Sequence, residues 1–123
     1  MVYSLIVLNA PWQGQAAQSA YRFAQAVLAA GHELRQVFFY GDGALALRPG
    51  SVAADRPDLD RDWRELGSRH GVAILACTTA AERRGLASAA AGEGRRPGAA
   101  RAGTLGQLML ALADSDRVLT FAD

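Results

Sequence analysis

The chain has 123 residues, half of them hydrophobic, which suffices for one domain with a substantial core. A net charge of +1 gives no sign of a general nucleic-acid binder, and the absence of lysine among the 13 basic residues excludes Schiff-base and P-loop lysine chemistry. One cysteine and two histidines rule out an internal disulfide framework and the common zinc sites, so no metal and no cofactor is expected.

The first part of the chain alternates between strand-like and helical patterns. The apolar run at 3–8 predicts a buried strand, and because it is short and lacks the basic leader of a signal peptide, we expect a cytoplasmic location. Apolar side chains recur with helical spacing over 15–30, and Gly31 follows as a typical residue just beyond a helix end. A second strand is predicted at 33–40, before a loop rich in Gly, Pro and Asp at 41–57.

The same alternation continues along the rest of the chain. Residues 59–70 have the spacing of an amphipathic helix, and Asp58 is suited to be its N-cap. A third strand at 71–77 leads directly into a segment predicted to be helical at least as far as Arg84. The remaining predicted elements are a flexible loop at 91–103, an amphipathic helix marked by Leu105, Leu108, Met109 and Leu112, and a strand at 116–121. No run approaches the ~20 apolar residues of a membrane span, so no membrane partner is expected.

Strands that alternate with helices predict an α/β fold. We expect a single-domain three-layer sandwich with a mostly parallel sheet of four to five strands, in the flavodoxin-like order 2-1-3-4. Ligand sites in such sheets lie at the carboxyl ends of the strands, near the point where the strand order reverses. That point is expected between the first and third strands, so the loops after the first two strands should lie beside the end of the third.

The only cysteine, Cys77, falls at the predicted carboxyl end of the third strand. A helix start follows it, which Thr78 and Thr79 are able to cap, and the unpaired N–H groups there favour a thiolate. Arg83 and Arg84 add positive potential further along the same helix. On the residues alone, a reactive thiol and an inert buried cysteine are equally well supported, because free cysteines often serve as small core residues.

A catalytic Cys–His pair is not expected. His32 and His70 each precede a predicted strand, so they should lie at the amino-terminal edge of the sheet, about 17–20 Å from the opposite edge. A thiol without an internal base or a second cysteine suits persulfide transfer, in which Cys77 would take sulfur from one partner and present it to the thiol of another.

Several other residues allow both a functional and a structural interpretation. Trp12 could shield the sulfur or anchor a partner, and Tyr40 could donate a hydrogen bond near the site, although both also suit a core. Asp42 is most simply a turn residue, and Trp63 a core residue. Five arginines lie close together in the sequence: Arg83, Arg84, Arg95, Arg96 and Arg101. They suggest a docking patch for an acidic carrier protein or an anionic sulfur species, or alternatively a solvated surface.

Four stretches carry a resemblance to a known family: "SAYRFAQAVLAAGHEL", "QVFFYGDGA", "DWRELGSRHGVAILACTTAAERRG" and "SDRVLTF". Together they resemble the DsrE/TusD family of sulfur-relay proteins along most of the chain. The resemblance implies one DsrE-like α/β domain over 1–123, with the cysteine at the position of Cys77 accepting persulfide sulfur. It implies small persulfide-carrier proteins as donor and acceptor, and homologous subunits in a heterohexamer. Family branches serve either 2-thiouridine synthesis in tRNA or dissimilatory sulfur oxidation.

The main prediction is therefore a sulfurtransferase subunit that passes persulfide sulfur through Cys77, with no direct contact to nucleic acid. The alternative is a non-catalytic assembly subunit of a DsrE-like hetero-oligomer, in which the same cysteine would be buried. A third hypothesis, a flavodoxin-like ligand-binding module, has less support in the sequence, because the loop after the first strand lacks a G-x-G-x-x-G fingerprint.

Overall fold

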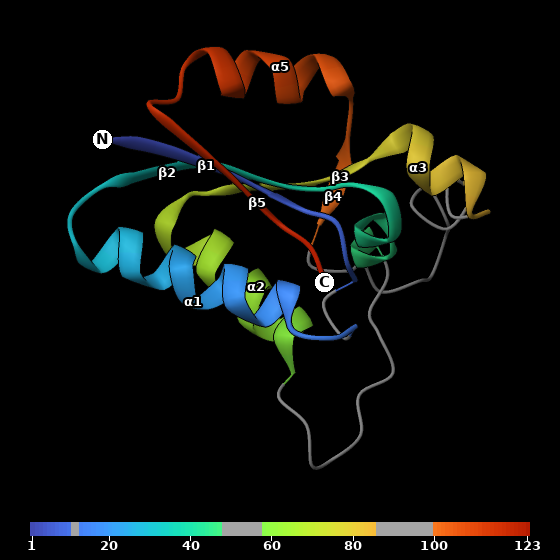
Figure 1. The fold of residues 1–123 in the computed structure, drawn as a ribbon, viewed down its shortest axis with the longest axis horizontal. Coiled ribbons are helices and arrows are strands. Elements are labelled where there is room, and N and C mark those ends of the chain that lie inside the picture. Colours follow the sequence, from blue (N-terminus) through green and yellow to red (C-terminus); the bar gives the residue numbers. More distant parts are fainter. Residues whose placement is uncertain (11–12, 48–57, 86–99) are drawn as a thin grey trace.

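The computed structural model describes residues 1–10, 13–47, 58–85 and 100–123, and these residues form a parallel sheet with helices on both faces (Figure 1). The strands are β1 (Val2–Val7), β2 (Glu33–Phe39), β3 (Ala73–Cys77), β4 (Arg101–Gly103) and β5 (Arg117–Phe121). The helices are α1 (Ala16–Ala29), the 3-10 helix η1 (Gly41–Leu47), α2 (Leu59–His70), α3 (Thr78–Arg83) and α5 (Leu105–Ala113). The predicted α/β class and the predicted number of strands are confirmed.

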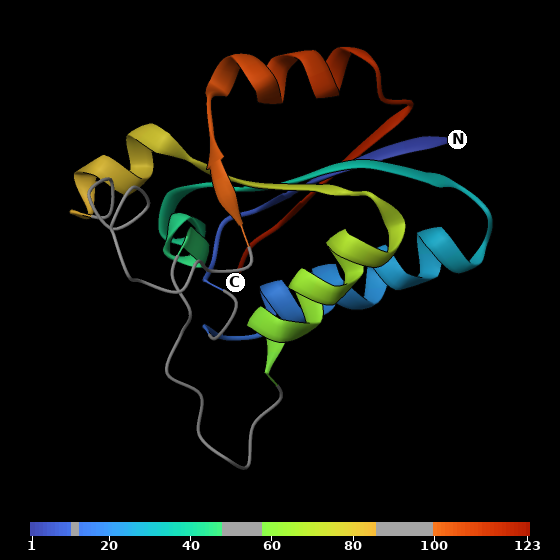
Figure 2. The same ribbon diagram turned by 180° about the vertical axis from the view of Figure 1, so that it is seen from behind.

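The two faces of the sheet are covered unequally. Helices α1 and α2 lie side by side on one face, and among the described helices α5 covers the other, as both views show (Figures 1 and 2). Buried alanines of α1 allow this helix to approach the sheet closely. Trp63 of α2 is fully buried, with its ring edge-on to Tyr21 at 5.1 Å and to Phe39 at 5.7 Å, which confirms its predicted core position.

The predicted strand order 2-1-3-4 is wrong, because the observed order is β4-β3-β2-β1-β5 with every neighbouring pair parallel. From β1 to β3 the chain steps in one direction, through α1 and α2 on a single face. It then returns across the opposite face through α5 and adds β5 to the free side of β1. The direction therefore reverses at β1, and the loop after β1 is separated from β3 by β2.

Strand β4 was missed in the predicted loop 91–103. Its three residues pair in parallel with the end of β3, so that Cys77 lies opposite Gly103. A three-residue strand is too short to show a period of two in the sequence. Thr104 follows it as the N-cap of α5, in a capping box with Gln107. Residues 91–99 lie outside the described part of the chain.

The start of α2 agrees with the sequence pattern. The side chain of Asp58 accepts a hydrogen bond from the Arg61 N–H at 3.1 Å, as an N-cap does. Gly71 ends the helix in the left-handed conformation, with φ of 65°. Local signals thus delimit the helix that leads into β3.

Candidate functional site at Cys77

Cys77 is the last residue of β3 and also the N-cap of α3, as the sequence predicts for a strand-to-helix junction. Its Sγ accepts a hydrogen bond from the Ala80 N–H, with 3.5 Å between sulfur and nitrogen. A backbone N–H that points at sulfur stabilises a negative charge there more than a neutral thiol. The cap is therefore supplied by the cysteine itself, and not by Thr78 or Thr79.

The thiol lies in a closed environment, because Cys77 is only 1% exposed. It belongs to the hydrophobic core, where η1 packs against both β3 and α3. The nearby buried side chains of η1 and α3 are small: Ala44, Ala46, Ala80 and Ala81. The loop "YGDG" after β2 is thus beside β3, as predicted, whereas the loop after β1 is one strand further away.

The two threonines have different surroundings. Thr78 Oγ1 donates a hydrogen bond to the Gly103 carbonyl at 2.8 Å and so joins the start of α3 to β4. Thr79 is exposed. Thr78 is therefore an anchor for the helix that carries the cysteine at its N-terminus.

Arg84 is engaged in an ion pair that the sequence did not suggest. Its Nε and Nη2 donate to Asp42 Oδ1 at 3.0 and 2.8 Å, and its Nη1 donates to the Ala80 carbonyl at 3.0 Å. The turn residue Asp42 thereby connects η1 to the end of α3. No signal in the sequence pairs these residues, because 42 positions separate them.

Of the other predicted site residues, two lie at the carboxyl edge of the sheet, one begins β4, and three lie outside the described residues. Tyr40 directly follows β2 and is exposed, and Arg83 is exposed on α3. Arg101 is an exposed residue of β4. The residues outside the described part are Trp12, Arg95 and Arg96.

Both histidines lie at the opposite edge, as predicted. His32 immediately precedes β2, with its Nδ1 3.1 Å from the amino group of Met1. His70 ends α2, before β3 begins. Neither imidazole can therefore serve as a base for Cys77.

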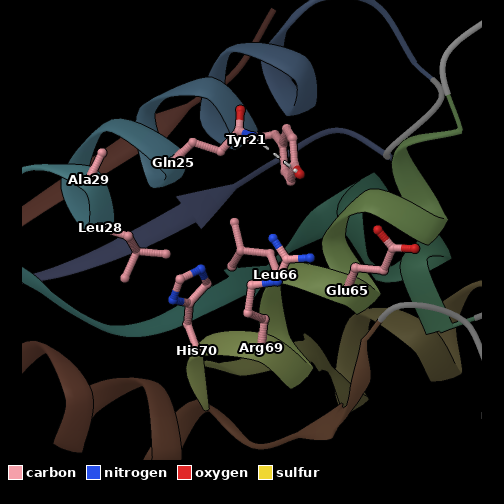
Figure 3. A pocket seen from close by; sticks show the side chains of 8 residues that line it. All are labelled: Tyr21, Gln25, Leu28, Ala29, Glu65, Leu66, Arg69 and His70. Carbon is pink, nitrogen blue, oxygen red and sulfur yellow. Dashed lines mark hydrogen bonds between the residues drawn. The ribbon is translucent and has the colours of Figure 1, made fainter.

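A separate cavity of about 360 Å³ lies between α1 and α2, away from the cysteine (Figure 3). Its lining residues are Tyr21, Gln25, Leu28, Ala29, Glu65, Leu66, Arg69 and His70. Burial raises the pKa of the Tyr21 hydroxyl, and the carboxylates of Asp62 and Glu65 raise it further. This cavity contains no nucleophile suited to sulfur transfer.

Within the residues that the structure describes, no three His, Cys, Asp or Glu side chains form a group able to hold a metal ion. Among the described helices, none is both long and apolar enough to cross a bilayer.

The fold and the site together define the class of this protein: it is a parallel α/β domain whose one cysteine is buried at a strand-to-helix junction. The chain belongs to the DsrE/DsrF-like family, whose model matches residues 1–121. This confirms the family resemblance seen in the sequence.

Two relatives are named Sulfurtransferase TusD, from Pectobacterium carotovorum subsp. carotovorum (strain PC1) and from Pectobacterium atrosepticum. Each is 42% identical to this chain over 127 residues, which covers 97% of the chain and 98% of the relative. Their name agrees with the predicted class of activity.

Two solved structures share the fold. The YchN protein of E. coli has a TM-score of 0.77 at 23% identity, covering 98% of this chain and 100% of its own. The BT1422 protein of Bacteroides thetaiotaomicron has a TM-score of 0.60 at 15% identity, covering 96% and 93%. At these identities the similarity concerns the architecture alone.

Proposed function

We propose that this chain is a sulfurtransferase subunit that carries persulfide sulfur on Cys77. The observation that carries the proposal is the position of the one cysteine, with its Sγ facing the Ala80 N–H where β3 becomes α3. The resemblance to proteins named Sulfurtransferase TusD over nearly the whole chain supports it.

The proposed reaction consists of two thiolate exchanges. The Cys77 thiolate attacks the outer sulfur of a donor persulfide, the donor S–S bond breaks, and the donor leaves as a thiolate while Cys77 becomes a persulfide. An acceptor thiolate then attacks the same outer sulfur, and Cys77 leaves as a thiolate. One S–S bond forms for each that breaks, so the exchange needs neither an external oxidant nor a cofactor. The Ala80 N–H supports the negative charge on Cys77 whenever it is the attacking or leaving group.

The proposed donor and acceptor are small persulfide-carrier proteins in the cytoplasm, where thiols stay reduced. Arg83 and Tyr40 are exposed at the carboxyl edge of the sheet and are suited to contact such carriers. The sulfur would pass toward tRNA 2-thiouridine synthesis or serve dissimilatory sulfur oxidation, as the family resemblance implies.

Helix α5 supplies a surface for the proposed homologous subunits of a heterohexamer. It contains no charged residue, and Leu105, Met109 and Leu110 are 45%, 64% and 70% exposed. Val118 on the neighbouring strand β5 is also exposed. Several large apolar side chains on one face are a common mark of a protein–protein interface.

The burial of Cys77 favours a second candidate, a non-catalytic assembly subunit. In that case the thiol is core material, and native protein would react with thiol reagents only through unfolding. The same α5 surface would serve the assembly.

Mass spectrometry after incubation with a persulfide donor separates the two candidates. The proposal expects a gain of about 32 Da, one sulfur atom, on the native protein and no gain in Cys77→Ser. Absence of the adduct with several competent donors, in the chain alone and in the complex with its homologous subunits, would leave the assembly role.

A further inference from the structure

The thiol of Cys77 is buried where α3 and η1 meet, and within the described part of the chain the Asp42–Arg84 ion pair links these two elements. Helix α3 begins at the residue after Cys77, and η1 packs against both α3 and β3. Arg84, directly after α3, binds Asp42 of η1 through two N–H groups and binds the Ala80 carbonyl through a third. The Arg84 guanidinium therefore links the end of α3 to η1 through Asp42, and it stabilises the last turn of α3 through the Ala80 carbonyl.

Among the described residues, the end of α3 is held by its packing against η1 and by the contacts of Arg84. A helix of six residues has little stability of its own, and its buried side chains are the two alanines Ala80 and Ala81. The hydrogen bond from Thr78 to Gly103 anchors only the start of the helix. Loss of the Arg84 contacts would release the end of α3 from η1 and would also free the carbonyl of Ala80, the residue whose N–H faces Cys77 Sγ. The turn that covers the sulfur could then move away, while Thr78 keeps the start of α3 attached to β4.

A partner protein can reach the Asp42–Arg84 ion pair from solvent, whereas it cannot reach the thiol of Cys77. The side chains of Arg84 and Asp42 are 31% and 53% exposed, but Cys77 is 1% exposed. Gly41, the first residue of η1, and Gly85, which follows Arg84, have φ of 61° and 69°, a region open to glycine at little cost. Both segments therefore have a permissive backbone position next to the contact.

We propose that the Asp42–Arg84 pair is a positioning contact that keeps Cys77 closed, and that a partner carboxylate which takes Arg84 from Asp42 opens α3 and exposes the thiol. The purpose of this opening rests on the proposed sulfur relay, because a relay cysteine must meet two visiting thiols. The effect on access does not depend on the relay. Arg84 thus acts through the position of α3 and does not touch the sulfur.

The rate at which iodoacetamide alkylates native Cys77 tests the proposal. Local opening limits this rate, so Asp42→Asn and Arg84→Gln should each raise it by about three- to tenfold. The double variant should match Arg84→Gln, because without Arg84 the side chain of Asp42 has no ion pair left to lose. Arg61→Gln, which removes an exposed ion pair with Glu65 on α2, should leave the rate unchanged. Unchanged alkylation in Asp42→Asn and Arg84→Gln overturns the proposal.

Two further measurements exclude a merely structural effect. Added salt should speed alkylation of the native chain but not of Asp42→Asn, because salt screens an exposed ion pair. Alkylation of the variants should depend little on low urea concentrations, since opening α3 exposes a small surface. A urea dependence equal to that of global unfolding would overturn the proposal.

Persulfide loading of the same proteins keeps the two proposals apart. Faster alkylation in the variants without loading in any protein would support the role of the ion pair and count against the relay. Loading of the native chain with alkylation rates unaffected by the variants would support the relay and overturn the role of the ion pair.

Discussion

Gly43 shows how closely η1 is seated on the carboxyl ends of the strands. A Cβ atom at this position would lie 2.5 Å from the Val7 carbonyl oxygen and 3.1 Å from the Cβ of Phe39. Neither neighbour is the end of a flexible side chain, so the backbone of η1 would have to move. Because residue 43 is glycine, η1, which contains Asp42, can pack closely against the carboxyl ends of β1 and β2.

Gly43→Ala should lower the free energy of unfolding by about 1–3 kcal/mol, as expected for overpacking against backbone. Gly106→Ala in α5 is the matched control, because its Cβ would meet only Thr104 Oγ1 at an ordinary 3.6 Å. That substitution should leave the protein as stable or slightly more stable, since alanine favours helices. Urea denaturation of both variants provides the comparison, and equal effects would contradict the packing argument.

Ionisation of the Tyr21 hydroxyl should make the free energy of unfolding depend on pH in the alkaline range. Its folded-state pKa is raised above 10.0, chiefly by burial, so the folded chain keeps a proton that the unfolded chain has lost. The free energy of unfolding should therefore fall as the pH rises through 10.0 toward the raised pKa. Tyr21→Phe should show a smaller fall in urea denaturation measured from about pH 9 to about pH 11. Equal slopes for the two proteins would argue against the raised pKa.

At the scale of elements, α1 has a cap that comes from the far end of the sequence. Its N-cap residue Gln15 makes no side-chain cap, but the Asp123 carboxylate accepts hydrogen bonds from the N–H groups of Gln15 and Ala16 at 3.0–3.1 Å. Gly14 leaves space for this carboxylate, which a Cβ there would overlap. A carboxylate at a helix N-terminus gains both hydrogen bonds and a favourable dipole interaction.

Asp123→Ala should lower the free energy of unfolding by about 1 kcal/mol, and Asp123→Asn by less, because the amide oxygen still accepts hydrogen bonds. Asp58→Ala, which removes the local cap of α2, should cost a similar amount and serves as the reference. Thermal unfolding checks all three variants. A fully stable Asp123→Ala would show that water replaces the carboxylate.

Apart from η1 and β4, which lie in segments predicted to be loops, the described helices and strands follow from local sequence, whereas the contacts between them do not. The periodicity over 59–70, with Asp58 and Gly71 at its ends, delimits α2 correctly. The Asp123 cap joins residues 107 positions apart, and no local pattern connects them. In the same way, the sequence places Cys77 at the junction of β3 and α3 but gives no sign of the Asp42–Arg84 pair.

For the molecule as a whole, the α/β class was predictable and the order of its strands was not. An amphipathic pattern shows that a helix covers a sheet, but it does not say which face is covered. With α1 and α2 on one face and α5 on the other, β2 separates β1 from β3. The predicted order placed β1 beside β3 and therefore misplaced the loop after β1.

If the exposed apolar side chains of α5 form the subunit interface, a charged substitution among them should prevent assembly. Leu110→Glu should prevent association with the proposed homologous subunits while leaving the unfolding of the isolated chain almost unchanged, because Leu110 is 70% exposed. Arg22→Glu, an exposed site on the helix layer across the sheet, should assemble normally. Size-exclusion chromatography with light scattering on co-expressed subunits reports the outcome. Normal assembly of Leu110→Glu would place the interface elsewhere.

The pairing of β1 with β5 has a consequence for how the protein reaches its native state. The Val2 N–H binds the Asp116 carboxylate and the Asp116 N–H binds the Val2 carbonyl, across 114 positions of sequence. A nascent chain that has emerged only through α5 therefore leaves one edge of β1 without hydrogen-bond partners. Closing so long a loop is slow, and an open strand edge invites aggregation in the meantime. The sheet is therefore completed only after β5 has been synthesised, when the first strand gains its second neighbour.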